Sequence, residues 1–330
     1  MSSGMSFPKR LHYYDRIFRA YLLPGKSHLT FWHETPEENA QASYDELGEY
    51  YMTFAEKADY RGHYDAAGTP MLDYHGQIGL QYNPIAIAQY GLGNFNLHSR
   101  NRDPERRRKF LTVSDWLCAN LEQNPFGIRV WNHKFDWEYR DTLHAPWYSG
   151  LAQGQGISLL VRAHRETNDK RYLEAARHAF QSFSCSIAEG GVVFTDERGD
   201  PWIEEYLVDP PTHILNGFIW AAWGIRDYFL ATSEQGAADL FSRFTGTLAR
   251  NLEGYDLGFW SLYEQSGTRL KMIASPFYHQ LHIVQLRILQ RMTGNEFFGK
   301  VAARWEAYTR SRAKRTAALC YKSAFKLCYY

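Results

Sequence analysis

The sequence predicts a mainly α-helical protein, an incomplete α/α toroid of about four helical hairpins. Two observations support this prediction. A pattern of apolar helix, short polar turn and amphipathic helix recurs along the chain, and the longer segments between the pairs show strand-like alternation. A helix that is apolar nearly all round is a buried one, whereas a helix with a charged face covers a surface. The pairs therefore form an inner and an outer ring.

Four stretches follow this plan in chain order. In each, the first helix is apolar or carries small residues, the turn is short and polar, and the second helix has a charged face. The expected pairs are 83–98 with 106–123, 151–166 with 170–184, 214–231 with 237–252, and 279–292 with 297–312.

Residues 74–314 are predicted to form this helical domain. Residues 1–73 are interpreted as an arm of short strands and loops, because strand-like alternation and Gly/Pro punctuation occur there without a long helix. Residues 315–330 are expected to be a basic C-terminal tail. From Arg310 onward the chain carries six cations and no acid, which favours a solvated or poorly ordered tail, with binding to an anionic membrane or polymer as the alternative.

The segments between hairpins indicate where a site would lie. Each outer helix must return to the next inner helix, and the three return segments, near residues 124–147, 187–213 and 252–277, emerge at the same end of the ring. In the second segment, Val192 to Phe194 is expected to be the first strand of a β-hairpin that turns through Glu-Arg-Gly-Asp. Short β-hairpins are thus expected at this mouth of the ring.

Composition narrows the possible partners. The formal net charge is +1, so the whole-chain charge gives no reason to expect a nucleic acid as partner. Aromatic residues make up 16% of the chain. Rings with polar tips suit a groove that stacks sugars, and they equally suit a tyrosine-rich core, so composition leaves both readings open.

The absence of certain sequence patterns predicts where the protein is located and whether it binds a cofactor. The first 25 residues contain no apolar region typical of a secretory signal, and no run approaches the roughly 20 apolar residues of a membrane span. A cytoplasmic protein with no integral membrane segment is therefore expected, unless a longer precursor exists. The four cysteines form no CxxC pair and no zinc spacing. No cofactor is predicted, and a structural divalent cation is left open.

The stretch from Pro201 to Phe218 concentrates two adjacent carboxylates, a tyrosine and three prolines before an expected helix. Two consecutive residues of an extended segment face opposite sides, so one of Glu204 and Glu205 faces the cavity. Pro210 and Pro211 are expected to brace the loop, because proline removes backbone freedom. Taken alone, such a cluster also fits a salt-bridged structural loop.

Other polar residues converge on the mouth. Tyr278, His279 and His282 open the fourth inner helix with the two histidines three residues apart on one face, and Tyr263 lies in the preceding return segment. His282 fits a core histidine equally well. A metal site needs three or four ligands, and His279 and His282 with Glu205 would supply three only in a geometry that the sequence does not show, so no metal is predicted.

Several long stretches resemble one known family. In chain order they are NPIAIAQYGLG at 83–93, WYSGLAQGQGISLLVRAH at 147–164, EEYLVDPPTHILNGF at 204–218, YHQLHIVQL at 278–286 and RWEAYTRSRAK at 304–314. They are similar to the C-terminal helical domain of the D-glucuronyl C5-epimerase family, which acts on heparosan and heparan-sulfate precursors. The resemblance covers residues from about 74 to 314.

The resemblance implies an isomerase that inverts C5 of D-glucuronate within a polysaccharide or glycan to give L-iduronate. A proton alpha to a carboxylate is weakly acidic, so a positioned base must remove it while the carboxylate is neutralised or hydrogen-bonded. The family's glutamate and tyrosine motif falls on Glu205 and Tyr206, and its further tyrosines fall on Tyr263 and Tyr278. Glu205 and Tyr278 are then the opposed acid and base groups, with Tyr206 and Tyr263 supporting the intermediate.

Candidate substrate-binding residues gather in the same mouth segments and helix starts. They are Trp147, Tyr148, Gln153, Asn216, His279, His282 and Arg269. Arg269 is included because the family's Tyr-Asp-x-Arg stretch reads Tyr-Glu-Gln-Ser here, so Arg269 or Lys271 is expected to replace the missing arginine as a carboxylate clamp. In the family, β-rich domains before the helical domain help to form the polymer groove and the dimer, so the homodimer expected here rests on the resemblance alone.

Three other functions are left open. A polysaccharide lyase on the same scaffold also begins with removal of the C5 proton and then eliminates the C4 oxygen by β-elimination. A non-catalytic glycan-binding protein would keep the aromatic groove, although stacking alone would not need Glu205, Tyr206 and Tyr278 together. A glycosidase would need two carboxylates, and Glu205 with Glu264 is the pair to test.

Overall fold

The computed structural model describes residues 31–329 of the 330-residue chain. The sequence expectation about a secretory signal concerns residues 1–25 and lies outside the described residues. Within the described part, no helix is both long enough and apolar enough to cross a membrane.

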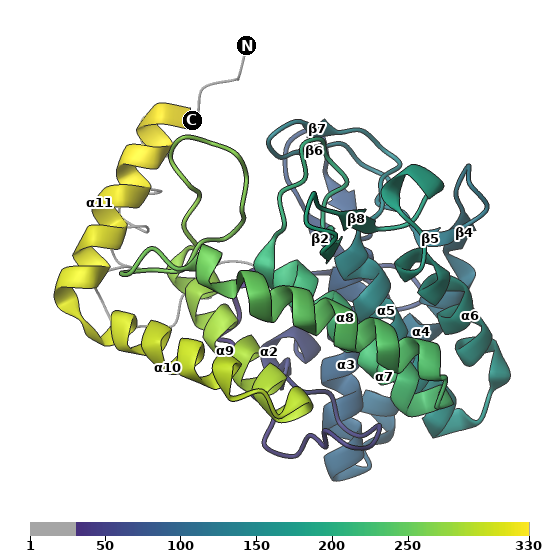
Figure 1. Ribbon diagram of the computed structural model, residues 1–330. Coiled ribbons are helices and arrows are strands. Elements are labelled where there is room, and N and C mark those ends of the chain that lie inside the picture. The colour runs from purple at the N-terminus through teal and green to yellow at the C-terminus, as the bar shows by residue number, and fades with distance from the viewer. Residues whose placement is uncertain (1–30, 330) are drawn as a thin grey trace.

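Four helical hairpins form the body of the molecule, as the sequence predicts (Figure 1). Within each hairpin the two helices pack on one another, and the first helices of successive hairpins pack side by side, α3 on α5, α5 on α7 and α7 on α9. The hairpins are α3 (Pro84–Asn101) with α4 (Pro104–Ala119), α5 (Gly150–Thr167) with α6 (Lys170–Phe180), α7 (Leu215–Thr232) with α8 (Gln235–Asn251), and α9 (Pro276–Thr293) with α10 (Glu296–Arg310).

Burial separates the two rings. Nearly every residue in the first three turns of α3, α5 and α7 is buried, whereas α4, α6, α8 and α10 each bury a single face. Small residues allow the inner helices to approach closely, because a Cβ added at Gly154 of α5 would lie 2.9 Å from Ala221 O of α7. The inner ring is therefore the core.

The four hairpin turns share one geometry. The residue after each inner helix adopts the left-handed conformation, and the next residue caps or begins the outer helix. In α3–α4, Arg102 has φ 54° and the side chain of Asp103 accepts from the N–H groups of the following helix. Asn168, Ser233 and Gly294 occupy the same left-handed position in the other three turns.

Three short antiparallel hairpins lie in the return segments at the mouth, as expected. β4 (Leu121–Gln123) pairs with β5 (Arg129–Trp131), and β6 (Trp137–Glu138) pairs with β7 (Thr142–Leu143). β8 (Val193–Thr195) pairs with β9 (Pro201–Ile203) through a turn at Gly199, whose φ is 81°.

The described segment before α3, residues 31–83, consists of short elements. It contains η1 (Phe31–His33), α2 (Ala55–Ala58) and an antiparallel sheet of β1 (His63–Tyr64), β2 (Pro70–Asp73) and β3 (Leu80–Gln81). Because β2 pairs with β3, this sheet spans the predicted boundary between residues 73 and 74.

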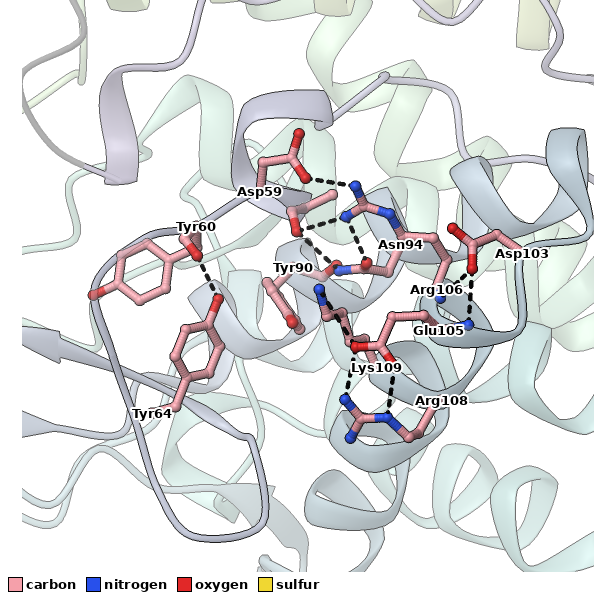
Figure 2. Close-up of polar contacts among 11 residues, drawn as sticks. Asp59, Tyr60, Tyr64, Tyr90, Asn94, Asp103, Glu105, Arg106, Arg108 and Lys109 are labelled. Atoms are coloured by element: carbon pink, nitrogen blue, oxygen red, sulfur yellow. Dashed lines mark hydrogen bonds and ion pairs between the residues drawn. The ribbon is translucent and has the colours of Figure 1, made fainter.

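Polar contacts fasten the arm to the first hairpin (Figure 2). Arg106 of α4 donates to Ala58 O at 3.1 Å and to Asn94 Oδ1 at 3.2 Å, and it pairs with Asp59 at 2.6 Å. On the opposite side of the arm, Glu38 pairs with Arg291 of α9 at 3.0 Å. The arm therefore contacts both α3–α4 and α9, the first and last hairpins of the ring.

The arm also inserts two tyrosines into the inner ring. The Tyr51 hydroxyl donates to Asp227 Oδ1 at 2.6 Å, and Asp227 pairs with Arg162 at 2.7 Å, with both ionised side chains 0% exposed. Gln155 donates to the Tyr50 hydroxyl at 2.5 Å. A buried ion pair is tolerated only where its remaining hydrogen bonds are satisfied, and the arm supplies part of that set.

The C-terminal residues form a helix rather than a poorly ordered tail, and most of their described side chains stay exposed or half-buried, as a solvated tail predicts. α11 (Arg312–Tyr329) begins before the predicted boundary and stands beside the return segment that precedes α9 (Figure 1). Ala318 and Phe325 are buried, and the Lys322 ammonium donates to Ile273 O at 2.7 Å. Ala318 and Phe325 are seven residues apart and therefore lie on one face of the helix.

Candidate functional site

A cavity of about 140 Å³ opens at the mouth of the ring. Its wall combines residues of the arm, of the first return segment and of α3, α7 and α9, and eight of the fourteen lining residues are aromatic. The lining residues include Gln89, Trp147, Glu205, Tyr206, Asn216, Trp220 and Tyr278. Aromatic residues both line this cavity and fill the core, where Tyr50, Tyr51, Tyr90, Tyr228 and Tyr255 are buried.

The two adjacent glutamates have separate tasks, as the strand argument predicts. Glu204 turns away from the cavity, where its carboxylate accepts from the backbone N–H groups of Thr212 and His213 at 3.3 and 3.0 Å and contacts His213 Nδ1 at 2.5 Å. The His213 ring in turn stacks on Trp202 at 4.3 Å. Glu204 therefore braces the loop, a task that the sequence had suggested for the prolines.

Glu205 faces the cavity from the loop between β9 and α7, with 5% of its surface exposed. Its Oε2 has no hydrogen-bond partner among the described residues. Burial raises the pKa of Glu205 to about 8, a hydrogen bond with Tyr206 opposes the rise, and the charges of Glu264 and Glu204 add to it. A carboxyl group that titrates near neutrality suits general acid–base chemistry.

Three tyrosines surround this carboxyl group. Tyr278, from the first turn of α9, lines the cavity, and its ring contacts that of Tyr263 at 4.8 Å. Burial and the charge of Glu205 raise the pKa of Tyr278, Tyr206 and Tyr263 above the ordinary value. All three phenols are thus protonated at neutral pH, which makes them proton donors at rest.

The structure brings Glu205, Tyr206, Tyr278, Trp147 and Asn216 together at the cavity. Behind Trp147, the neutral ring of His133 stacks at 3.8 Å and holds the indole in place. Burial lowers the pKa of His133 to about 3.

The paired histidines are not brought to the cavity. His279 and His282 are 0% exposed, and both contact Ser261 Oγ, at 2.7 and 3.1 Å. His279 also stacks on Trp260 at 3.9 Å and lies 3.1 Å from Trp305 O. Their expected contact with substrate is therefore corrected, because the face of α9 that carries them points towards the outer helix.

Three other predicted residues also lie away from the cavity wall. Gln153 is 0% exposed and holds the mouth in place, since it accepts from Trp131 N at 3.0 Å and donates to Arg129 O at 3.1 Å. The Tyr148 hydroxyl donates to Gly190 O at 3.0 Å. Arg269 is exposed and does not line the cavity, so the structure gives it no place as a clamp there.

Sequence reasoning missed two lining residues that carry free polar atoms. Gln89 of α3 and Trp220 of α7 are 1% and 6% exposed, and neither the Gln89 amide nor Trp220 Nε1 has a hydrogen-bond partner in the described part of the chain. Both residues lie inside inner helices whose sequences are mostly apolar. A side chain with a polar atom in such a helix was the feature of the sequence that could have identified them. Asn216 Oδ1 also lacks a partner there.

A second carboxylate lies close to the cavity. Glu264 is 4% exposed, and its Oε2 accepts a hydrogen bond from Tyr139, whose ring contacts that of Tyr206 at 4.6 Å. Within residues 31–329, no group of three or more His, Cys, Asp or Glu side chains is arranged to hold a metal ion.

Part of the chain is similar in sequence to known proteins. Residues 123–307 match the family described as D-glucuronyl C5-epimerase C-terminus. The chain is 29% identical to the D-glucuronyl C5-epimerase of Caenorhabditis elegans over 63% of its own length and 36% of that protein, so it spans about a third of this relative.

Two further relatives match a similar part of the chain. An uncharacterised protein of Methanocaldococcus jannaschii is 29% identical over 64% of this chain and 71% of its own length. An unsaturated chondroitin disaccharide hydrolase of Streptococcus pneumoniae is 22% identical over 60% of this chain and 48% of its own. The family match covers more than half of the 330 residues and contains the loop of Glu205 and the start of α9. The chain therefore belongs to the D-glucuronyl C5-epimerase family, through the C-terminal domain of that family.

Proposed function

We propose that this protein is a uronate C5-epimerase that converts D-glucuronate to L-iduronate residues in a polysaccharide or glycan. The observation that carries the proposal is a cavity in which one carboxyl group with a pKa of about 8 faces a protonated tyrosine from a different element. The family of the chain and the aromatic wall, which suits sugar rings, support it.

In the proposed reaction, ionised Glu205 removes the C5 proton and the electrons of that C–H bond move into the substrate carboxyl group, giving an enediolate. The Tyr278 hydroxyl then delivers its proton to C5 from the other face. Tyr206 and Tyr263, which hydrogen-bond with Glu205 and Tyr278, hold these two groups in place. After one turnover Glu205 is protonated and Tyr278 is a phenolate, and proton exchange with solvent restores both.

The proposal is tested by proton NMR of the protein with heparosan in deuterium oxide. Epimerisation removes the C5 proton signal of glucuronate and produces iduronate resonances that carry deuterium at C5. Tyr278→Phe is expected to abolish the iduronate resonances, because deuterium can then return to C5 only from Glu205 and on the original face, and unchanged formation of iduronate by that variant contradicts the role given to Tyr278. Unsaturated end groups that absorb in the ultraviolet would identify a lyase instead. Tight binding of uronate polymers without any proton exchange would identify a glycan-binding protein.

A further inference from the structure

Four residues that line the cavity carry buried polar atoms without a hydrogen-bond partner in the described part of the chain. They are Gln89 with both amide atoms, Glu205 with Oε2, Asn216 with Oδ1 and Trp220 with Nε1. Each is at most 6% exposed. Buried polar groups in proteins are nearly always paired, so a cluster of exceptions on one cavity wall calls for an explanation. A bound ligand that supplies the partners is the explanation a cavity offers.

The two N–H donors of this group lie together. Gln89, Trp220 and Tyr278 line both the main cavity and a smaller one beneath the arm, so they stand where the two cavities meet. Asn216 precedes Trp220 by four residues and lies on the same face of α7, one turn nearer to the loop of Glu205. The two N–H donors therefore lie beside Tyr278, together with the amide oxygen of Gln89, whereas the acceptors Glu205 Oε2 and Asn216 Oδ1 lie towards the loop of Glu205.

The charge of the cavity decides what these donors can bind. Among residues 31–329, none of those that line the main cavity is a lysine, arginine or histidine. The smaller cavity is lined by Glu34, Glu37 and Lys57, and the Lys57 ammonium already donates to Phe31 O at 2.6 Å and lies 4.3 Å from the centre of the Phe31 ring. An anionic group that enters the main cavity thus meets neutral N–H donors.

We propose that the amide of Gln89 and the indole N–H of Trp220 bind the substrate carboxylate, and that Asn216 Oδ1 accepts a hydrogen bond from a ring hydroxyl. The inference rests on the proposed function, since it assumes that the ligand is a uronate. It replaces the arginine clamp that the sequence suggested with two uncharged donors from α3 and α7.

This arrangement also favours the proposed chemistry. When the C5 proton leaves, negative charge grows on the carboxylate oxygens, and fixed donors in a buried site stabilise that charge without reorganising. Tyr278 stands beside both donors, so C5, which carries the carboxylate, lies within reach of its hydroxyl. Loss of one such donor typically slows an enzyme by about 10²- to 10³-fold. Gln89 and Trp220 are therefore expected to affect the exchange rate more than the affinity.

The test measures binding of two ligands by calorimetry: a heparosan tetrasaccharide, and the same tetrasaccharide with its glucuronate carboxyl groups reduced to alcohols. The wild type is expected to bind the acid form about 10- to 100-fold more tightly, in keeping with hydrogen bonds to a charged group. Gln89→Leu and Trp220→Phe are expected to remove most of that preference. Gln89→Glu is expected to bind the acid form worst of all and to keep its affinity for the reduced form.

Trp223→Phe is the matched control. Trp223 lies on the same helix, and its buried indole N–H also lacks a partner among residues 31–329, but it lines neither cavity. This variant should keep the preference of the wild type. The inference is overturned if the preference survives in Gln89→Leu and Trp220→Phe, if Lys57→Met alone removes it, or if the wild type shows none. Failure of the proposed function gives a different result. The wild type would then still prefer the acid form, and Gln89→Leu and Trp220→Phe would still lose that preference, but no C5 exchange would be detected.

Discussion

The carboxyl group of Glu205 lies against the Cα atom of Gly217, in the space that any side chain at position 217 would occupy. A Cβ there would stand 2.9 Å from Glu205 Cβ and closer still to Oε2. Gly217 belongs to the first turn of α7, where the helix N-terminus carries partial positive charge. The missing side chain thus allows a carboxyl group to be buried beside a helix start.

Gly217→Ala is expected to displace Glu205 and to lower the rate of C5 deuterium exchange by at least about 100-fold, because a small misplacement of a catalytic group costs that much. The measurement is the exchange rate with heparosan in deuterium oxide. Gly236→Ala in α8 is the matched control, since a Cβ at that helical glycine meets nothing within 4 Å. It should keep full activity and gain up to about 1 kcal/mol of stability. Equal activity in both variants would show that Glu205 need not stay where it is.

The rate of exchange should rise with pH. As a base, Glu205 acts only when ionised, so kcat/KM is expected to increase with a midpoint at about pH 8. It should show no falling limb below pH 10, because the pKa of the donor Tyr278 is raised. Tyr206→Phe removes the hydrogen bond that lowers the Glu205 pKa and should move the midpoint up, whereas Glu264→Gln removes a neighbouring negative charge and should move it down. If the midpoint is the same in Tyr206→Phe, Glu264→Gln and the wild type, the titrating group is not Glu205.

Stability should depend on pH through the same carboxyl group. The folded protein raises the pKa of Glu205 from 4.5 to about 8, so folding favours its protonated form. This contribution is complete below pH 4.5 and is lost as the pH rises through 8. Glu205→Gln carries no charge at this position. Its unfolding free energy should therefore equal that of the wild type at pH 4 and exceed it at pH 9 by on the order of 4 kcal/mol. Thermal unfolding at the two pH values measures the difference, and a variant less stable at pH 9 would refute the burial argument.

The buried ion pair beneath the cavity should matter for folding alone. Arg162→Met leaves Asp227 charged and unpaired inside the ring, which is expected to cost about 3–5 kcal/mol of unfolding free energy. The rate per folded molecule should not change, since neither residue lines the cavity. Adding Asp227→Leu removes the orphaned charge and should restore part of the loss. Arg171→Ala, which breaks an exposed pair with Asp169, is the control and should leave the melting temperature unchanged.

The sequence predicted the ring because the alternation of apolar and amphipathic helices is local information. The start of α6 could be placed from its capping residue Asp169, whereas α9 begins three residues before the expected start at His279, after the cap Ser275. The opposite directions of Glu204 and Glu205 followed from the geometry of an extended chain, which is also local. For such features, periodicity and caps were sufficient.

Features that depend on distant parts of the chain could not be predicted in the same way. The histidine pair of α9 faces Ser261 and Trp305, which became apparent only once α9 was docked on α10. Gln89 is adjacent to Trp220 and Tyr278 at the cavity because three inner helices meet there, and no spacing within α3 reveals it. Phe325 is buried although the chain around it is basic, because Lys322 and its neighbours extend over the return segment.

The insertion of the arm into the ring sets the order in which this protein is completed during synthesis. Tyr51 and its partner Asp227 are 176 residues apart. At about 5–20 residues per second, a ribosome needs roughly 10–35 s to make the chain between them. Throughout that interval the aromatic arm has been made, but α7, which carries its partners Trp220, Trp223 and Asp227, has not. The nascent chain therefore exposes Tyr50, Tyr51 and Phe54 until the third hairpin is made, and this is the period in which a chaperone would protect it.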